Sequence, residues 1–145
     1  MDTKKIAESL IRKFNTNNPF VIADRLNITI LYSAMGSTLG FFSKYKRCKF
    51  IHMSNTIPDS LESFVCAHEQ GHAICHHDRN TPFLKRHTLV STDKIEREAN
   101  RFAVELLLPD KLLQSHPDTS IHVMAAMCGI PAILIEHKHI NIGKT

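Results

Sequence analysis

The feature that most constrains this chain is the pentapeptide His68-Glu69-Gln70-Gly71-His72, which lies within a helical pattern of apolar residues. Two histidines four residues apart on an α-helix lie one above the other on the same face. They continue a stripe at helical spacing that also includes Leu61, Phe64, Val65 and Cys75. The stripe predicts that both imidazoles point into the protein. The opposite side is small or apolar as well, so we expect this helix to be covered on most faces.

Two histidines at this spacing can both bind a single metal ion. Glu69 lies between them, offset from their face, where its carboxylate can hold a metal-bound water as a general base. This combination is typical of zinc hydrolases, so the sequence predicts Zn²⁺ bound by His68 and His72, with Glu69 as the catalytic residue. The alternative is a pair of core histidines whose ring nitrogens are satisfied by ordinary hydrogen bonds.

Composition narrows the class of protein. A chain of 145 residues is most simply one domain, and 43% hydrophobic with 22% charged residues is ordinary for a soluble globular protein. There is no apolar run near the ~18 residues of a membrane span and no signal-peptide layout, so we expect a cytoplasmic protein without membrane attachment. The net charge of +4 is dispersed, and the four cysteines form no CxxC pair. Direct nucleic-acid binding and a cysteine-based zinc site are therefore not expected.

The remaining periodicity predicts an α+β fold with a small, mainly antiparallel sheet. Strands are predicted at 28–32, 38–44 and 47–53, and helices at 2–14, 19–26, about 59–75, 93–108, near 110–115, 119–127 and 131–139. Between the two long helices, the polar segment up to about residue 92 is predicted to be an irregular loop. Asp59 or Ser60 is expected to cap the histidine-bearing helix, with Glu62 closing a capping box.

A catalytic zinc site usually has three protein ligands, and three residues outside the second long helix compete for the third place. His76 continues the histidine face, but three stacked histidines span ~12 Å of helix, which is too long for one tetrahedral ion. Asp78 has the spacing of a third ligand in one class of zinc peptidases, but Cys75 stands where that class has the glycine that turns the chain back. His52 lies on a predicted strand, where a lone histidine is more often structural.

The helix over 93–108 offers Glu96 as the third ligand. Its predicted buried side consists of Ile95, Ala99, Phe102, Ala103 and Leu106. Its predicted solvated face carries Lys94, Glu98, Arg101 and Glu105. Glu96 lies at the margin of the buried side, so it is the glutamate expected to point inward, unless it only closes a capping box with Asp93. Asn100, one turn later, is placed to hydrogen-bond a metal-binding histidine.

The pentapeptide and the segment Glu96-Arg97-Glu98-Ala99-Asn100-Arg101-Phe102-Ala103-Val104-Glu105-Leu106-Leu107-Leu108-Pro109 together resemble the ImmA/IrrE-type family of zinc metallopeptidases. The second motif of that family is approximately E-x-x-A-N-x-F-A-x-x-L-L-x-P, and the resemblance covers roughly residues 5–110. It implies a zincin-like metallopeptidase domain over residues 1–110, with the sheet packed on both motif-bearing helices. It also implies that His68, His72 and Glu96 bind zinc and that Glu69 is the catalytic base. Residues 111–145 are expected to form a helical extension packed on the same domain.

The resemblance further implies a zinc-dependent endopeptidase that cleaves a helix-turn-helix repressor of a prophage, mobile element or stress regulon. The alternative is a non-proteolytic anti-repressor with structural zinc, although such a protein would not need Glu69. A DNA-binding module built from helices around 124–136 is a third, weaker hypothesis. The substrate is expected to add to an exposed strand edge near 38–53. The motifs fix no residue that stabilises the transition state, for which the possible histidines are His52, His87, His116 and His122.

Overall fold

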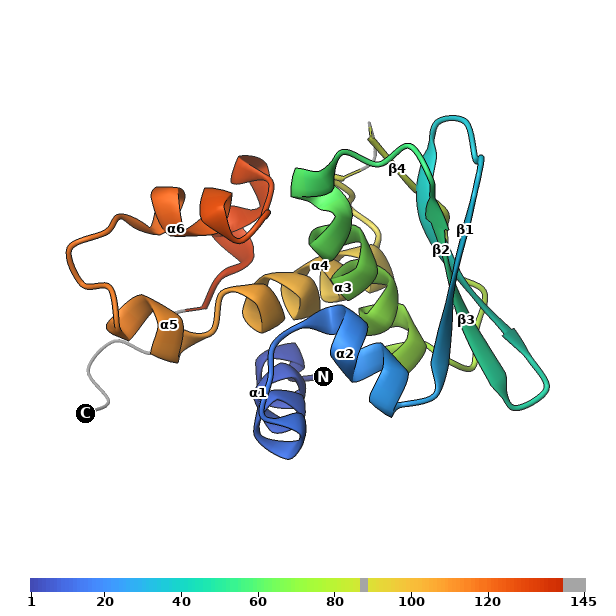
Figure 1. Cartoon of the computed structure of the whole chain (residues 1–145), viewed down its shortest axis with the longest axis horizontal. Helices are drawn as coiled ribbons and strands as arrows, with labels where there is room; N and C mark the ends of the chain where they lie inside the picture. The colour runs from blue at the N-terminus through green and yellow to red at the C-terminus, as the bar shows by residue number, and fades with distance from the viewer. Residues whose placement is uncertain (87–88, 140–145) are drawn as a thin grey trace.

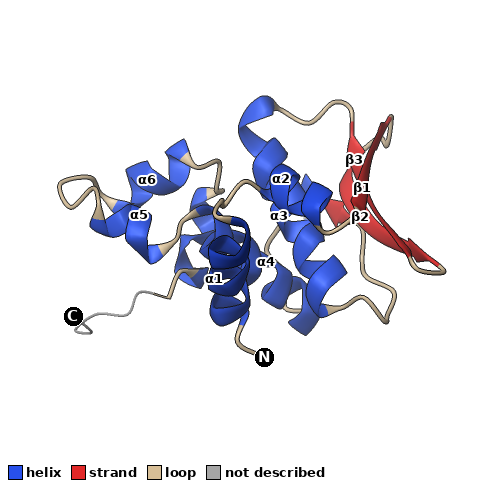
Figure 2. Ribbon diagram, turned by 60° about the horizontal axis from the view of Figure 1, so that its bottom comes forward, coloured by secondary structure: helices blue, strands red, loops and turns tan. Residues whose placement is uncertain are grey.

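The computed structural model describes residues 1–86 and 89–139, which form a small sheet with the described helices gathered on one side of it (Figures 1 and 2). The elements in chain order are α1 (Thr3–Phe14), α2 (Pro19–Arg25), β1 (Ile28–Ser33), β2 (Thr38–Tyr45), β3 (Cys48–Ser54), α3 (Asp59–Cys75), β4 (Leu84–Lys85), α4 (Lys94–Leu107), α5 (Asp110–Gln114), α6 (Ile121–Met127) and the 3₁₀-helix η2 (Ala132–His137). The α+β prediction is confirmed, and the predicted helices and strands before Pro109 are present close to their expected bounds.

The sheet has the strand order β1-β3-β2-β4 and is mixed. β1 runs parallel to β3, whereas β2 is antiparallel to both β3 and β4. Two of the three pairings are therefore antiparallel, as expected, but the parallel pair was not predicted. β4 was not predicted either, since it lies within the expected irregular loop and two residues are too few to show a period.

Helix α3 lies between the sheet and α4 (Figure 1). The inner face of the sheet buries Leu39, Phe42, Ile51 and Met53, and α3 is buried continuously from Phe64 to Ala73. Gly71 allows α4 to come close, because a Cβ at this position would lie 3.1 Å from Phe102 Cδ1 and 3.3 Å from Ala99 Cα. This close approach brings the start of α4 beside the histidines of α3.

The predicted cap of α3 is wrong. The helix begins at Asp59 with Pro58 as its N-cap, and no side chain caps it. Asp59 and Glu62 instead lie in the first turn, where carboxylates favour the positive end of the helix dipole. Glu62 also accepts a hydrogen bond from the Tyr32 hydroxyl at 2.9 Å, so its carboxylate ties α3 to β1.

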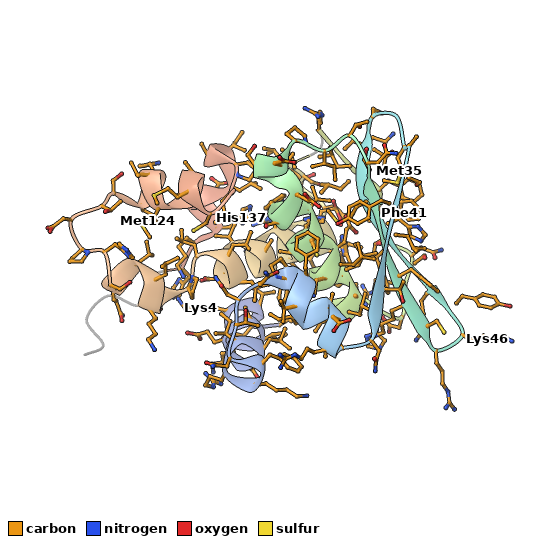
Figure 3. All side chains as sticks on the ribbon, in the orientation of Figure 1. Lys4, Met35, Phe41, Lys46, Met124 and His137 are labelled. Atoms are coloured by element: carbon orange, nitrogen blue, oxygen red, sulfur yellow. The ribbon has the colours of Figure 1, made fainter. Side chains whose placement is uncertain are left out.

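The two ends of the described chain meet at the far end of α4. Helix α1 and η2 both pack on α4, and Figure 3 labels Lys4 and His137 from these two segments. The helix predicted over 131–139 is the shorter 3₁₀-helix Ala132–His137, in which Leu134 is buried. No described helix is both long and apolar enough to cross a membrane. All four cysteines are free, and Cys48 is exposed.

Candidate metal centre

His68 and His72 lie one turn apart on the buried face of α3, and neither side chain is exposed. Their ring centroids are 5.0 Å apart and the rings are nearly perpendicular. Each ring makes a contact within the protein through its Nδ1 atom. His68 Nδ1 lies 2.8 Å from Asn100 Oδ1, and His72 Nδ1 lies 2.9 Å from His76 Nδ1. The contact between Asn100 and His68 is the one that the sequence predicts. These contacts direct both Nε2 atoms toward α4.

Glu96 meets these two nitrogens from the first turn of α4. Its Oε1 atom lies 2.6 Å from His72 Nε2, and its Oε2 atom lies 3.5 Å from His68 Nε2. The capping alternative does not describe this side chain, because Asp93 caps α4 and the Asp93 amide donates to Ser91 Oγ. One ligand atom from each of His68, His72 and Glu96 lies within 4.8 Å of the others. The three residues that the sequence predicts as ligands are therefore the three that the fold brings together.

The buried polar atoms at this point fit a bound metal ion. His68 Nε2 and both carboxylate oxygens of Glu69 are buried without a hydrogen-bond partner. Such an atom costs about 1–3 kcal/mol when it is left unsatisfied. Two imidazole nitrogens and one carboxylate are also the donor set of one class of catalytic zinc site. Glu69 Oε2 lies 4.0 Å from His68 Nε2, beside the three possible ligands but not among them.

The electrostatics separate the two carboxyl groups. Burial raises the pKa of Glu69 to about 8, since no hydrogen bond compensates its charge. Burial acts in the same direction on Glu96, but the adjoining imidazoles of His68 and His72 outweigh it and hold the pKa of Glu96 at about 2. Burial lowers the pKa of His72 to about 4. An ionised Glu96 beside a neutral His72 is the state that a metal ion requires of these ligands.

The other histidines and Asp78 lie outside this cluster. Asp78 has a side chain that is 69% exposed, and it faces Arg79 at 3.7 Å. His52 Nε2 lies 2.8 Å from Ser43 Oγ, and the His52 ring stacks on Phe41, which Figure 3 labels on the sheet. His116 and His122 are exposed on the C-terminal segments, and His87 lies outside the described residues. His76 is not a member of the ligand cluster, but it is buried directly behind His72.

The predicted solvated face of α4 is wrong at two residues. Glu98 is 9% exposed and Glu105 is 3% exposed. Glu98 Oε1 lies 3.1 Å from His76 Nε2, whereas Glu105 pairs with Lys138. Both partners come from segments distant in sequence, so the periodicity of α4 alone could not reveal them. The only local signal was that His76 continues the histidine face of α3.

No strand near residues 38–53, where an exposed edge is predicted, is an outer strand of the described sheet. β3 is an inner strand, and β2 is bordered by β4, with Gly40 opposite Leu84 and Thr38 opposite Lys85. A Cβ at Gly40 would lie 3.4 Å from Glu69 Cγ, so this part of β2 passes close to the proposed catalytic residue. The outer strands of the described sheet are β1 and β4.

Comparison with known proteins agrees with this geometry. Residues 23–138 match the Peptidase_M78 family, described as the IrrE N-terminal-like domain, so the match extends well past residue 110. The chain is 40% identical over 141 residues to "Uncharacterized immunity region protein 2" of Bacillus phage phi105, covering 95% of this chain and 89% of that protein. It is 32% identical over 146 residues to "Metallopeptidase ImmA" of Bacillus subtilis (strain 168), covering 97% of this chain and 85% of the relative.

Proposed function

The chain belongs to the Peptidase_M78 family, described as the IrrE N-terminal-like domain, and we propose that it is a zinc-dependent endopeptidase of zincin-like architecture. His68, His72 and Glu96 are the proposed zinc ligands, and Glu69 is the proposed catalytic base. The observation that carries the proposal is the meeting of these three ligand atoms within 4.8 Å, beside a buried carboxylate with two unpartnered oxygens. Residues 1–110 would form the catalytic domain, with 111–145 packed on it as an extension.

The mechanism assigns the proton transfers to Glu69. When bound, Zn²⁺ would supply Lewis acidity toward water and the scissile carbonyl. Glu69 accepts the proton that the attacking water loses, holds it on a carboxylate oxygen, and donates it to the leaving amine. Burial alone raises the pKa of this carboxyl, and a zinc ion beside it would lower that pKa and favour the ionised base that accepts the proton. Since neither oxygen has another partner, no hydrogen bond has to break for this transfer.

The proposed substrate is a helix-turn-helix repressor acting in the cytoplasm. This class comes from the family resemblance, and the names of two relatives, an immunity region protein and the metallopeptidase ImmA, agree with it. Contact with β2 near Gly40 is the proposed binding mode for the substrate backbone, since this part of the strand passes close to Glu69. The pairing of β4 with Thr38 and Gly40 means that a substrate strand would have to displace β4 or add beyond it.

The experiment compares wild type, Glu69→Gln and Glu62→Gln in the zinc-loaded state. Each protein is incubated with the repressor encoded by the neighbouring open reading frame, and fragments are identified by mass spectrometry while repressor binding to its operator is followed in parallel. Glu62→Gln is the matched control, because it makes the same change on the same helix. The carboxylate of Glu62 accepts a hydrogen bond from Tyr32 and is not part of the ligand cluster.

We expect wild type and Glu62→Gln to cleave the repressor and abolish operator binding. Glu69→Gln should retain zinc and leave the repressor intact. If Glu69→Gln inactivates the repressor as well as wild type does, without fragments, the protein is a non-proteolytic anti-repressor and the peptidase proposal is wrong.

A further inference from the structure

We propose that His76 and Glu98 position His72 for metal binding, so that the third histidine of this region acts through His72 and is not itself a ligand. The inference rests on the proposed function, because it takes His72 to be a zinc ligand. His76 is 1% exposed and follows the last residue of α3. Its Nδ1 atom lies 2.9 Å from His72 Nδ1, and its Nε2 atom lies 3.1 Å from Glu98 Oε1. Three buried side chains thus form a continuous chain of contacts that ends at His72.

One arrangement of protons satisfies both contacts of His76 when both rings are neutral and the lone pair of His72 Nε2 is left for a metal. His72 must then carry its proton on Nδ1, which donates to His76 Nδ1. His76 accepts at Nδ1 and therefore carries its own proton on Nε2, which donates to Glu98 Oε1. The carboxylate of Glu98 therefore selects the tautomer of His76, and His76 selects the tautomer of His72.

The two proposed histidine ligands are supported in different ways. His68 Nδ1 donates to the amide oxygen of Asn100, whose Nδ2 atom donates to the Leu89 carbonyl at 2.9 Å. That support is a neutral amide. His72 is supported by an imidazole that is itself backed by a carboxylate, an arrangement that fixes ring orientation and increases the basicity of the ligand.

Position 76 offers two substitutions that separate the two contacts of its ring. Asparagine carries its amide atoms near the place of histidine Nδ1, so His76→Asn keeps an acceptor for His72 but loses Glu98. Glutamine carries its amide near the place of Nε2, so His76→Gln reaches Glu98 but leaves His72 Nδ1 without its acceptor. Glu98→Gln keeps the shape of the side chain and removes its charge. Glu105→Gln is the control, because Glu105 is also a buried glutamate of α4, but it pairs with Lys138 at the other end of the helix.

The experiment measures zinc affinity of the full chain by competition with a chromophoric chelator, and the visible absorption spectrum of the Co²⁺-substituted proteins. Neither readout depends on peptidase activity, and circular dichroism of each variant reports its folding. We expect His76→Gln and Glu98→Gln to bind zinc about 10–100-fold more weakly and to change the Co²⁺ spectrum. His76→Asn should lose less affinity than His76→Gln, and Glu105→Gln should bind zinc as wild type does.

Zinc affinity within about threefold of wild type for both His76→Gln and Glu98→Gln would overturn the inference. An equal loss in Glu105→Gln would also overturn it, since the effect would then follow general stability. If His76→Gln does not fold, Glu98→Gln alone decides by the same criterion. A wild-type chain that binds no zinc would remove the proposed function and this inference together, whereas a zinc-binding chain that cleaves nothing would remove only the proposed function.

Discussion

The two ends of α4 bury carboxylates in opposite ways. Near the start of the helix, Glu96 meets His68 and His72, and three buried atoms of His68 and Glu69 have no hydrogen-bond partner. At the other end, Glu105 pairs with Lys138, and Asp110 Oδ1 lies 2.8 Å from Lys4 Nζ and 2.7 Å from Lys138 Nζ. We call this second cluster the lysine end and the first the histidine end. Among the described side chains, no residue of the lysine end has a buried polar atom without a hydrogen-bond partner.

This difference teaches that buried charge alone does not identify a functional site. The lysine end matches opposite charges with one another and so holds the two ends of the described chain against α4, where Lys4 also donates to the His139 carbonyl. The histidine end leaves atoms unsatisfied at a cost of about 1–3 kcal/mol each, which a metal ion and its water can offset. We therefore interpret the lysine end as structural and the histidine end as a binding site.

Glu105→Ala should give the largest loss of stability. The substitution leaves Lys138, whose side chain is 1% exposed, without its closest carboxylate. Removing one partner of a buried ion pair costs about 3–5 kcal/mol, and we expect a loss of this size in urea unfolding. Zinc content per folded molecule should not change. Glu136→Ala is the control, since Glu136 is exposed nearby on η2, and a loss below about 1 kcal/mol in Glu105→Ala would contradict the structural role.

Zinc should stabilise the wild type and not Glu96→Ala. A ligand that binds only the folded state at a hundredfold excess over its Kd contributes about 2.7 kcal/mol. We expect thermal unfolding of wild type to shift upward when zinc replaces a chelator in the buffer. Glu96→Ala should lose most of this shift, whereas Glu105→Ala should keep it in spite of its lower starting stability. Equal shifts in wild type and Glu96→Ala would show that Glu96 is not a ligand.

The sequence was sufficient to bring together His68, His72 and Glu96, because spacing within each of two helices predicts which way these side chains point. The stripe that includes Phe64, Val65, His68 and His72 faces the core as the period predicts, and Glu96 points inward from the margin of the buried face of α4. Spacing on a single helix decides such a prediction, and the family motifs cover the same residues.

The lysine end, and the contact of Glu98 with His76 behind His72, could not be predicted in this way. Glu98 and Glu105 have the helical position of solvated residues, and only the partners brought by the fold make their burial favourable. Lys4 and Lys138 are separated by most of the chain, so no local period links them to Glu105. The two-residue strand β4 was not predicted for a related reason, since it is recognised as a strand by its pairing with β2.

Asp110→Asn should make the free energy of unfolding less sensitive to low pH. Burial acts to raise the pKa of Asp110, but hydrogen bonds from Lys138 and Lys4 outweigh it and hold the pKa below its ordinary value of 3.8. A carboxyl group with a lowered folded pKa stabilises the protein above its unfolded pKa, and this contribution is lost as the pH falls through the folded value. We expect Asp110→Asn to cost about 2 kcal/mol at pH 7, the size of a charged hydrogen bond.

The measurement for Asp110 is urea unfolding of wild type and Asp110→Asn from pH 7 to pH 3. The difference between the two proteins should be constant near neutrality and should narrow only below the ordinary pKa of 3.8. A difference that narrows between pH 7 and pH 5 would assign the effect to another group.

Asp78→Ala should have the smallest effect, and it tests the ligand assignment from the opposite direction. Asp78 has the spacing of a third ligand in one class of zinc peptidases, but its side chain is 69% exposed and its ion pair with Arg79, at 3.7 Å, is a surface contact. Such a pair contributes about 0–1 kcal/mol, so stability should change little. Zinc stoichiometry and affinity should equal those of wild type, because α3 ends before residue 78 and the cluster is complete without it. If Asp78→Ala loses zinc while Glu96→Ala retains it, the ligand comes from the end of α3 and α4 serves only to bury the histidines.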